Sequence, residues 1–298
     1  MSLHHKTVLL NEAIEGLSIK EGGVYIDATL GFGGHSEKIC QSNKNITLIG
    51  IDKDSFAIKS SEERLSKFAH CHFRAIQGDF RNIKQFLEEQ NVKEINGIVY
   101  DLGVSSYQID ASGRGFTFQK DEPLSMTLSD DDSNLFSAED VVNDWSEESL
   151  VSIIEGYGEE RFARRIAKSI VERRKTKRFE TTLELVECIK SSVPGFYRNG
   201  KINPATKTFQ AIRIAVNDEL GAVEQSLNDV LEKLAPNGKI AVITFHSLED
   251  RLIKRIFSRF EEEGKGKRVN KKVIKPSREE VLENPRSRSA KLRIFEKN

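Results

Sequence analysis

A glycine-rich turn between two acidic residues constrains the fold of this chain more than any other feature. An apolar run at 24–29 suits a short buried strand, and it contains Asp27 just before a Gly-x-Gly-Gly turn at 31–34. A second apolar run, 46–51, ends at Asp52. This order of strand, acid, turn, helix, strand and acid describes a nucleotide-type cofactor pocket at the carboxyl end of a parallel sheet.

The residues around the turn discriminate between cofactors. A dinucleotide fingerprint needs a third glycine three positions after the second, but Ser36 stands there. Asp27 would repel a pyrophosphate and attract a cationic ligand. S-adenosylmethionine carries a sulfonium and an ammonium group and no phosphate, so the sequence favours this methyl donor over NAD. We expect Asp52 to accept hydrogen bonds from the ribose, and ordinary loop glycines are the alternative.

Apolar runs alternate with helical patterns through the first hundred residues, which predicts a parallel sheet covered by helices on both faces. The pattern then changes, because residues 109–205 hold helical segments and no convincing strand. A single long helix at 208–234 and a strand at 239–245 resume the alternation. Two tail strands, 272–274 and 291–295, are expected to form an antiparallel hairpin at the sheet edge. The other expected strands are 24–29, 46–52, 72–77 and 95–101, and the other expected helices are 34–42, 54–67, 81–90, 138–142, 147–155, 159–174 and 182–190.

The predicted fold is therefore α/β: a Rossmann-like, S-adenosylmethionine-dependent methyltransferase sheet with an inserted all-helical domain. Residues 1–108 and 206–298 would form the two parts of the methyltransferase core, the second with a basic C-terminal edge hairpin. Residues 109–205 would form the inserted domain, which we expect to recognise the substrate.

The charges are balanced in number and uneven in place. There are 46 basic and 46 acidic residues, but residues 121–160 carry thirteen acidic and no basic side chains. Residues 161–178 carry nine basic and one acidic, and residues 264–298 carry twelve basic and four acidic. Such blocks are either solvated faces or, in an enzyme with a nucleotide-type cofactor, contacts to a polyanionic substrate.

Three cysteines, Cys40, Cys71 and Cys188, show no Cys-x-x-Cys spacing, so we expect free thiols and neither a disulfide framework nor a metal site. The N-terminus has no apolar signal core, and no run approaches membrane-spanning length. We therefore expect a cytoplasmic protein without a membrane partner.

Two further strand ends carry polar side chains. Asp101 follows the strand at 95–101, where it would accept a hydrogen bond from an amine substrate, touch the cofactor, or only cap a turn. His246 and Glu249 follow the strand at 239–245 and could work as an acid–base pair. The alternatives are a positioning role, or a capping box with Ser247 and Asp250.

Many ordered segments together resemble one known family. These segments are HKTVLLNE (5–12), DATLGFGGHS (27–36), DLGVSS (101–106), RGF (114–116), YGEER (157–161), NPAT (203–206), FQAIRIAVNDE (209–219), FHSLEDR (245–251) and RSRSAKLR (286–293). The chain is similar to the RsmH (MraW) family, bacterial enzymes that methylate N4 of a cytidine in 16S ribosomal RNA. One departure is PLSMTL at 123–128, where the family usually has PLDMRM, so Ser125, Thr127 and Leu128 put a polar role of that loop in doubt.

The resemblance implies S-adenosylmethionine as cofactor and, as substrate, a cytidine in the decoding region of 16S ribosomal RNA in the small ribosomal subunit. It gives no oligomeric state. The catalytic candidates are Asp101 and His246, and a backbone carbonyl of residues 102–105 is another possible acceptor for the amino group. The cytosine would stack on Tyr107, Phe116 or Phe118 unless these aromatics only pack in the core. The implied cofactor-binding residues are Gly33, Gly34, His35, Asp52, Phe80, Asp101 and Gln108.

Two basic groups are expected to flank the crevice and grip the RNA backbone, while residues 121–160 face away or gate entry. Side chains of a helix at 159–174 can share one face, and those near the edge hairpin can point one way. Three other functions stay open: the same chemistry on another RNA or on DNA, a non-catalytic RNA-binding assembly factor, and an NAD-dependent oxidoreductase. The expected RNA contacts are Arg173, Arg174 and Lys175 in the first group and Arg286, Arg288, Lys291 and Arg293 in the second.

Overall fold

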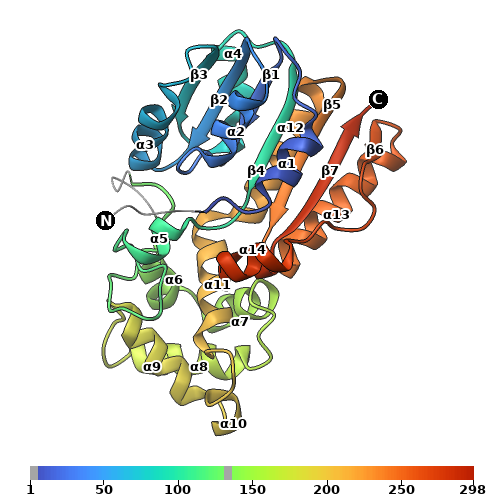
Figure 1. The fold of residues 1–298 in the computed structure, drawn as a ribbon. Coiled ribbons are helices and arrows are strands. Elements are labelled where there is room, and N and C mark those ends of the chain that lie inside the picture. The colour runs from blue at the N-terminus through green and yellow to red at the C-terminus, as the bar shows by residue number, and fades with distance from the viewer. Residues whose placement is uncertain (1–5, 131–135) are drawn as a thin grey trace. The chain divides into compact units, whose positions relative to one another are not determined.

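The computed structural model describes residues 6–130 and 136–298, and the chain divides into two units (Figure 1). The sheet unit comprises Met1–Gly103 and Leu220–Asn298, and the helical unit comprises Val104–Glu219. The helical unit thus begins before and ends after the 109–205 range expected for the insertion. His5, the first residue of the family-like N-terminal segment, lies outside the described residues.

The sheet unit contains a seven-stranded sheet in the order β3-β2-β1-β4-β5-β7-β6. The first five strands in this order are parallel, whereas β7 is antiparallel to both β5 and β6. This confirms the predicted Rossmann-like sheet, and the chain reverses its order of strand addition between β1 and β4, where such sheets bind ligands. The strands are β1 (Val24–Asp27), β2 (Ile46–Asp52), β3 (Cys71–Gln77), β4 (Ile95–Asp101), β5 (Leu234–Thr244), β6 (Gly266–Arg268) and β7 (Lys291–Lys297).

Helices cover both faces of this sheet. Two separate apolar clusters lie on the two faces, and neighbouring residues of β1 divide between them, with Tyr25 in one and Ile26 in the other. This alternation follows from the two-residue period of a strand. One face carries α1 (Leu10–Leu17), α2 (Gly34–Ser42) and α3 (Ser55–Leu65), and the other carries α4 (Ile83–Glu89), α12 (Glu219–Lys233) and α13 (Ser247–Glu262). A short helix, α14 (Arg278–Glu283), and the 3-10 turns η1 (Phe80–Asn82) and η3 (Pro285–Ser289) complete the unit.

The described part of the helical unit contains helices around one apolar core and no strand. Within α8, Ala163, Ile166, Ala167 and Ile170 are buried, which is the i, i+3, i+4, i+7 spacing of a helix with one apolar face. The opposite face of α8 is exposed and basic. The helices are α5 (Ser106–Asp110), α6 (Ala138–Asp144), α7 (Glu147–Gly156), α8 (Ala163–Arg174), α9 (Thr182–Ser192), α10 (Gly195–Arg198) and α11 (Ala205–Asn217).

The predicted bounds of three elements were wrong. The single helix at 208–234 is two helices, because Asp218 adopts a left-handed conformation with φ of 45° between α11 and α12. Helix α8 begins at Ala163 and not at Glu159, which has φ of 50°. The edge hairpin uses β6 and not 272–274, where Ile274 makes only an isolated bridge to Leu292.

The expectation of three free thiols was wrong for two of them. Cys40, near the end of α2, and Cys71, at the start of β3, form a disulfide with their Cα atoms 5.5 Å apart. Their separation of 31 residues gives no sign of this contact, since only the packing of α2 and β3 on neighbouring parts of the sheet creates it. Cys188 is free and buried, and burial raises the pKa of its thiol.

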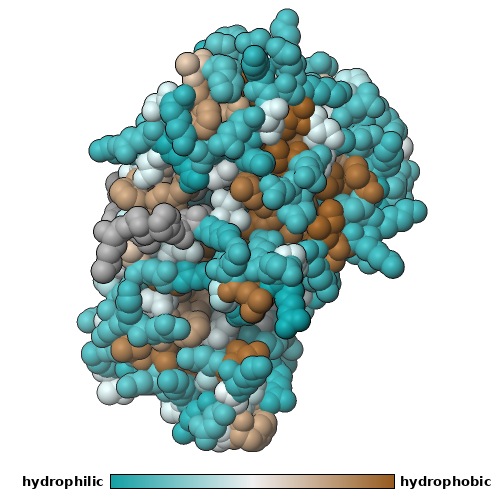
Figure 2. All heavy atoms as spheres, viewed as in Figure 1, coloured by the Kyte–Doolittle hydropathy of each residue, from teal (hydrophilic) through white to brown (hydrophobic). Residues whose placement is uncertain are grey.

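Hydrophilic side chains cover most of the visible face, and hydrophobic ones form small groups among them (Figure 2). Within 6–130 and 136–298, no helix combines the length and the apolar character needed to cross a membrane.

Candidate functional site

Three carboxylates end adjacent parallel strands at the carboxyl edge of the sheet unit. Asp27 ends β1, Asp52 ends β2 and Asp101 ends β4. The glycine-rich turn, residues 31–34, leads from this edge into α2. The structure therefore brings together the acids and glycines that the sequence singled out.

The conformation of the turn is fixed by hydrogen bonds from two other elements. The Gly31 amide donates to Oδ2 of Asp52 at 2.7 Å, and the Ser61 hydroxyl of α3 donates to the Gly31 carbonyl at 2.7 Å. Gly33 has φ of 73°, and a Cβ there would lie 3.0 Å from the Ser61 hydroxyl. Arg64 donates to the Phe32 carbonyl at 3.1 Å. Ser61 and Arg64 were missed by the sequence analysis, since nothing in the spacing places α3 beneath this turn.

Asp27 makes its hydrogen bonds within its own turn. Its Oδ2 accepts a hydrogen bond from the Ser36 hydroxyl at 2.8 Å, and its Oδ1 accepts one from the Thr29 amide at 3.3 Å. The side chain is only 1% exposed, and burial raises its pKa to about 6. The hydrogen bonds of Asp27 are therefore internal, and its attraction for a cationic ligand stays a prediction.

The N-terminal segment packs against the first turn of α2. A Cβ at Gly34 would overlap the Thr7 hydroxyl, so this glycine is required by close packing. Nε2 of His35 lies 3.2 Å from the Val8 carbonyl, and its Nδ1 lies 3.9 Å from Oδ2 of Asp101. Thr7 and Val8 thus help to shape the site from a segment that precedes the sheet. In the sequence, only the resemblance of residues 5–12 to the family indicated that this segment is functional.

Asp52 is partly exposed and keeps acceptor capacity for a ligand. Oδ1 accepts from the Asp54 amide at 3.0 Å, and Oδ2 accepts from Gly31. Burial raises the pKa of Asp52 to about 6, and these amide hydrogen bonds oppose the rise. The Lys53 amide is a third backbone donor to this carboxylate. A carboxylate accepts about four hydrogen bonds, so one acceptor position remains for a ligand.

Asp101 has an unusual environment for a carboxyl group. Its Oδ1 is buried and has no hydrogen-bond partner among the described residues. Burial raises the pKa of Asp101 well above its usual range, and the carboxylates of Asp27, Glu249 and Glu280 add to the rise. A buried polar atom without a partner is rare in proteins and suits a ligand that supplies a donor.

His246 is the N-cap of α13. Its Nδ1 accepts from the Glu249 amide at 3.4 Å, and Oε2 of Glu249 accepts from the His246 amide at 3.3 Å, which forms a capping box. The same Oε2 also accepts from the Phe245 amide at 2.8 Å. Nε2 of His246 lies 3.1 Å from Oε1 of Glu249. The capping alternative is thus present, with His246 and Glu249 as its members in place of Ser247 and Asp250.

The remaining cofactor candidates lie in different units. Phe80, in η1, packs edge-on against Tyr100 with ring centres 5.6 Å apart and stays partly exposed. Gln108 belongs to the helical unit, where its Oε1 accepts from the Ser105 amide at 2.8 Å in a capping box. Among residues 6–130 and 136–298, no cluster of three or more His, Cys, Asp or Glu side chains forms a metal site.

Comparison with known proteins decides the family. Residues 2–298 match the model of the MraW methylase family. The chain belongs to the MraW methylase family. It is 47% identical over 292 residues to ribosomal RNA small subunit methyltransferase H of Sulfurihydrogenibium sp. (strain YO3AOP1), covering 98% of each chain. It is 46% identical to the protein of the same name from Clostridioides difficile (strain 630), over the whole of both chains.

A solved structure gives a more distant likeness. The rRNA methylase from Streptococcus thermophilus has a TM-score of 0.47 and 10% identity, over 98% of this chain and 97% of that one.

The loop that departs from the MraW family pattern keeps internal hydrogen bonds in the helical unit. The hydroxyls of Ser125 and Thr127 lie 3.0 Å apart, and the Leu128 amide donates to Asn217 at 2.9 Å. The aromatic candidates nearby pack in the core of this unit, since Phe116 and Phe118 contact its apolar cluster and Phe118 lies edge-on to Phe209.

The basic block of the helical unit divides into internal and exposed side chains. The Arg173 guanidinium donates to the Glu184 carbonyl at 2.8 Å and covers the Phe179 ring. Arg174 donates to the carbonyls of Val142 and Trp145 at 2.8 and 2.7 Å. Lys175 is exposed. Two of the three expected RNA contacts therefore hold the unit together.

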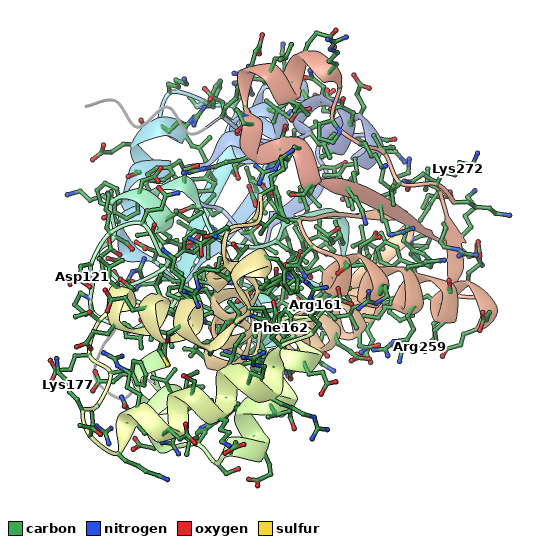
Figure 3. The ribbon with its side chains drawn as sticks, turned by 90° about the horizontal axis from the view of Figure 1, so that it is seen from below. Asp121, Arg161, Phe162, Lys177, Arg259 and Lys272 are labelled. Carbon is green, nitrogen blue, oxygen red and sulfur yellow. A yellow bond between two sulfur atoms is a disulfide. The ribbon has the colours of Figure 1, made fainter. Side chains whose placement is uncertain are left out.

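At the N-terminal end of α8, Arg161 stacks on aromatic rings. Its guanidinium lies 4.7 Å from the Phe162 ring and 4.8 Å from the Tyr197 ring, and Figure 3 shows Arg161 beside Phe162. The exposed face that follows along α8 carries Arg164, Arg165 and Lys168.

The C-terminal basic residues divide in the same way. Arg293 and Lys291 of β7 both pair with Asp250 of α13, at 2.7 and 2.9 Å. Arg286 and Arg288 lie in η3, where both are exposed and Arg288 donates to the Pro285 carbonyl at 3.0 Å. Of the four C-terminal residues expected to contact RNA, Arg286 and Arg288 are thus the exposed pair.

Proposed function

We propose that this chain transfers a methyl group from S-adenosylmethionine to N4 of one cytidine of 16S ribosomal RNA, in the decoding region of the small subunit. The observation that carries the proposal is the match to relatives named ribosomal RNA small subunit methyltransferase H, at 47% identity over 98% of the chain. The protein would act in the cytoplasm, on RNA within the small ribosomal subunit.

The residues at the carboxyl edge of the sheet fit this cofactor. Asp52 would hold the ribose, the turn with Gly33, Gly34 and His35 would approach the methionine part, and Asp101 would accept a hydrogen bond there. Phe80 would face the adenine, and the family resemblance makes Gln108 a further candidate for cofactor binding. When bound, the cofactor supplies an activated methyl group on a sulfonium.

The amino group of cytosine is a weak nucleophile, because its lone pair is delocalised into the ring. Alignment of N4 with the methyl group is therefore more important than strong base catalysis. Asp101 is our candidate to accept a hydrogen bond from N4 and to take up its proton, since Oδ1 has no partner among the described residues. The target base would be flipped out of its stack to reach the site. His246 would position the start of α13.

Exposed cations in both units would bind the RNA backbone. In the helical unit, these are Arg164, Arg165 and Lys168 with Lys175. In the sheet unit, these are Arg286 and Arg288. Arg173 and Arg174 would act indirectly, by holding α8 in place.

Methyl transfer to undermethylated ribosomes tests the proposal. Small subunits from cells that lack this gene would be incubated with the purified protein and S-adenosylmethionine, and the RNA nucleosides analysed by mass spectrometry. We expect N4-methylcytidine at one position, and an Asp101→Ala variant should reduce the rate. RNA binding without methyl transfer would instead support an assembly factor, and methylation of DNA or of another RNA would redirect the substrate.

A further inference from the structure

A groove outside the cofactor site runs along the first half of α13 in the sheet unit. It lies against the start of α12 and has a volume of about 600 Å³. Its lining includes three leucines, Leu220, Leu248 and Leu252, and three cations, Arg251, Lys254 and Arg255. Gly221 also lines it and adds no side chain.

The sequence of α13 places apolar and basic side chains along the same groove. Leu248, Arg251, Leu252 and Arg255 follow the i, i+3, i+4, i+7 spacing of a single helix face. The leucines form an apolar floor, because Leu252 is buried and Leu220 packs against the core of the sheet unit. Arg251, Lys254 and Arg255 are exposed along the rim.

The charge of the groove is positive. Among the described residues that line it, Glu224 is the one acid, and it lies 3.9 Å from Arg255. Arg259, labelled in Figure 3, adds another cation further along α13 and donates to Asn228 of α12 at 2.7 Å. An apolar floor with a cationic rim suits a nucleic-acid strand, whose bases have flat faces that pack on apolar side chains and whose phosphates are anionic.

The groove begins beside the carboxyl edge of the sheet. Helix α13 starts at Ser247, shortly after β5 ends, and β5 pairs with β4 at Ile243 and Asp101. The N-terminal end of the groove is therefore close in the chain to His246 and Glu249. An RNA strand whose target base enters the site at Asp101 could therefore continue along α13.

We propose that this groove binds a single-stranded segment of the substrate RNA next to the target cytidine. A base would pack on Leu248 and Leu252, and phosphates would pair with Arg251, Lys254 and Arg255. This proposal rests on the proposed function for the identity of the RNA, and it assigns that RNA a path over the sheet unit.

Substitution of Gly221 tests the groove without removing a cation. Gly221→Glu would place an acidic side chain in the groove, whereas Gly221→Ala is the matched control. Both replacements are better helix formers than glycine, so α12 should be retained in both variants. The probe is a fluorescent single-stranded oligoribonucleotide that carries the target cytidine and its neighbours. We expect about tenfold weaker RNA binding for the Glu variant, and binding within about twofold of the original for the Ala variant.

Removal of two rim cations provides a second measurement. The Lys254→Ala/Arg255→Ala variant should weaken binding and lower the salt slope by about 1.4, which is about 0.7 per lost phosphate contact on a single strand. The control is Lys271→Ala/Lys272→Ala, which removes the same charge from an exposed loop of the sheet unit. Cofactor affinity should be unchanged in every variant.

The outcomes separate this proposal from the proposed function. If the original protein transfers no methyl group but the Glu variant still loses RNA affinity, the reaction is wrong and the groove is supported. If the original protein methylates the cytidine while the Glu and rim variants bind RNA with unchanged affinity and salt slope, the groove proposal is overturned. Displacement of the RNA by polyglutamate of equal charge density as readily as by unlabelled RNA would also overturn it.

Discussion

The hydroxyl of Ser36 donates to Oδ2 of Asp27 across 2.8 Å and thereby joins the first turn of α2 to the end of β1. Both residues are buried. Ser36 occupies the position where a dinucleotide fingerprint has its third glycine, so the site replaces a close helix–strand contact with a hydrogen bond. Asp27 thus makes its hydrogen bonds within its own loop. We propose that Asp52 and Asp101 are the acids that face the cofactor.

The buried Asp27 gives a testable dependence of stability on pH. Its pKa of about 6 lies above the ordinary value of 3.8, so the folded chain keeps a proton that the unfolded chain releases in this interval. The contribution of Asp27 to the free energy of unfolding therefore falls as pH rises from about 4 to 6. The Asp27→Asn variant cannot titrate at this position. Its free energy of unfolding, minus that of the original protein, should therefore be about 1–3 kcal/mol higher at pH 7 than at pH 4. Urea denaturation at several pH values measures this.

Asp250→Asn is the control of opposite sign. Burial raises the pKa of Asp250, but Arg293 and Lys291 outweigh this effect and hold that pKa below its usual range. Its contribution is present above the ordinary pKa and is lost only as pH falls below it. The Asn variant should therefore show no improvement between pH 4 and pH 7. A stability difference for Asp27→Asn that is independent of pH would contradict the assignment of a raised pKa.

Asp52 is expected to be the main ribose contact. Asp52→Ala should lose charge-assisted hydrogen bonds of about 1.5–3 kcal/mol each, so cofactor affinity should fall at least about tenfold. The same change removes the acceptor of the Gly31 amide, and Asp52→Asn separates the two effects because its carbonyl oxygen can still accept from Gly31. Calorimetry with both variants, each shown to be folded, measures the affinities. Unchanged affinity in Asp52→Ala would remove Asp52 from the cofactor site.

The sequence predicted β2 and β4 well because each is an apolar run that ends at an acid. Residues 46–52 and 95–101 form β2 and β4 with these same bounds. The break at Asp218 was not located in this way, since the nearest glycine, Gly221, lies inside α12 and no proline stands near the break. Aspartate is one of the few residues that adopt the left-handed conformation with little cost, and only packing decides whether it does so.

The sequence predicted the acids and glycines of the candidate site, but it did not predict the residues that hold them in place. Asp52 and Gly33 are local signals, because an acid ends a strand and a glycine permits a positive φ. Ser61, Thr7 and the Cys40–Cys71 disulfide depend on contacts between elements far apart in the chain. No spacing rule reports such contacts, so they required the three-dimensional arrangement.

Arg174 is expected to stabilise the helical unit. Its guanidinium satisfies the carbonyls of Val142 and Trp145 at the end of α6, so Arg174→Ala should lower the free energy of unfolding by about 2–4 kcal/mol. Lys175→Ala, at the neighbouring exposed position, should have almost no effect on stability. Thermal unfolding of both variants checks this, and equal melting temperatures would show that Arg174 is not structural. Loss of RNA binding in an Arg174 variant would therefore not identify an RNA contact.

The exposed face of α8 gives a cleaner test of RNA binding by the helical unit. Arg164, Arg165 and Lys168 lie opposite the buried face, and alanine is a good helix former, so replacing all three should leave α8 intact. We expect weaker RNA binding and a salt slope lowered by about 0.7–0.9 for each lost phosphate contact. S-adenosylmethionine affinity should not change.

Exchange of the same three residues for the other basic type is the matched control. Arg164→Lys, Arg165→Lys and Lys168→Arg keep every charge, and lysine still binds phosphate as a point charge. The salt slope should therefore stay close to that of the original protein, although bidentate contacts through arginine would be lost at two positions. Fluorescence anisotropy with the small-subunit RNA at several salt concentrations measures both variants. An alanine variant whose slope equals that of this control would show that the basic face of α8 is only a solvated surface.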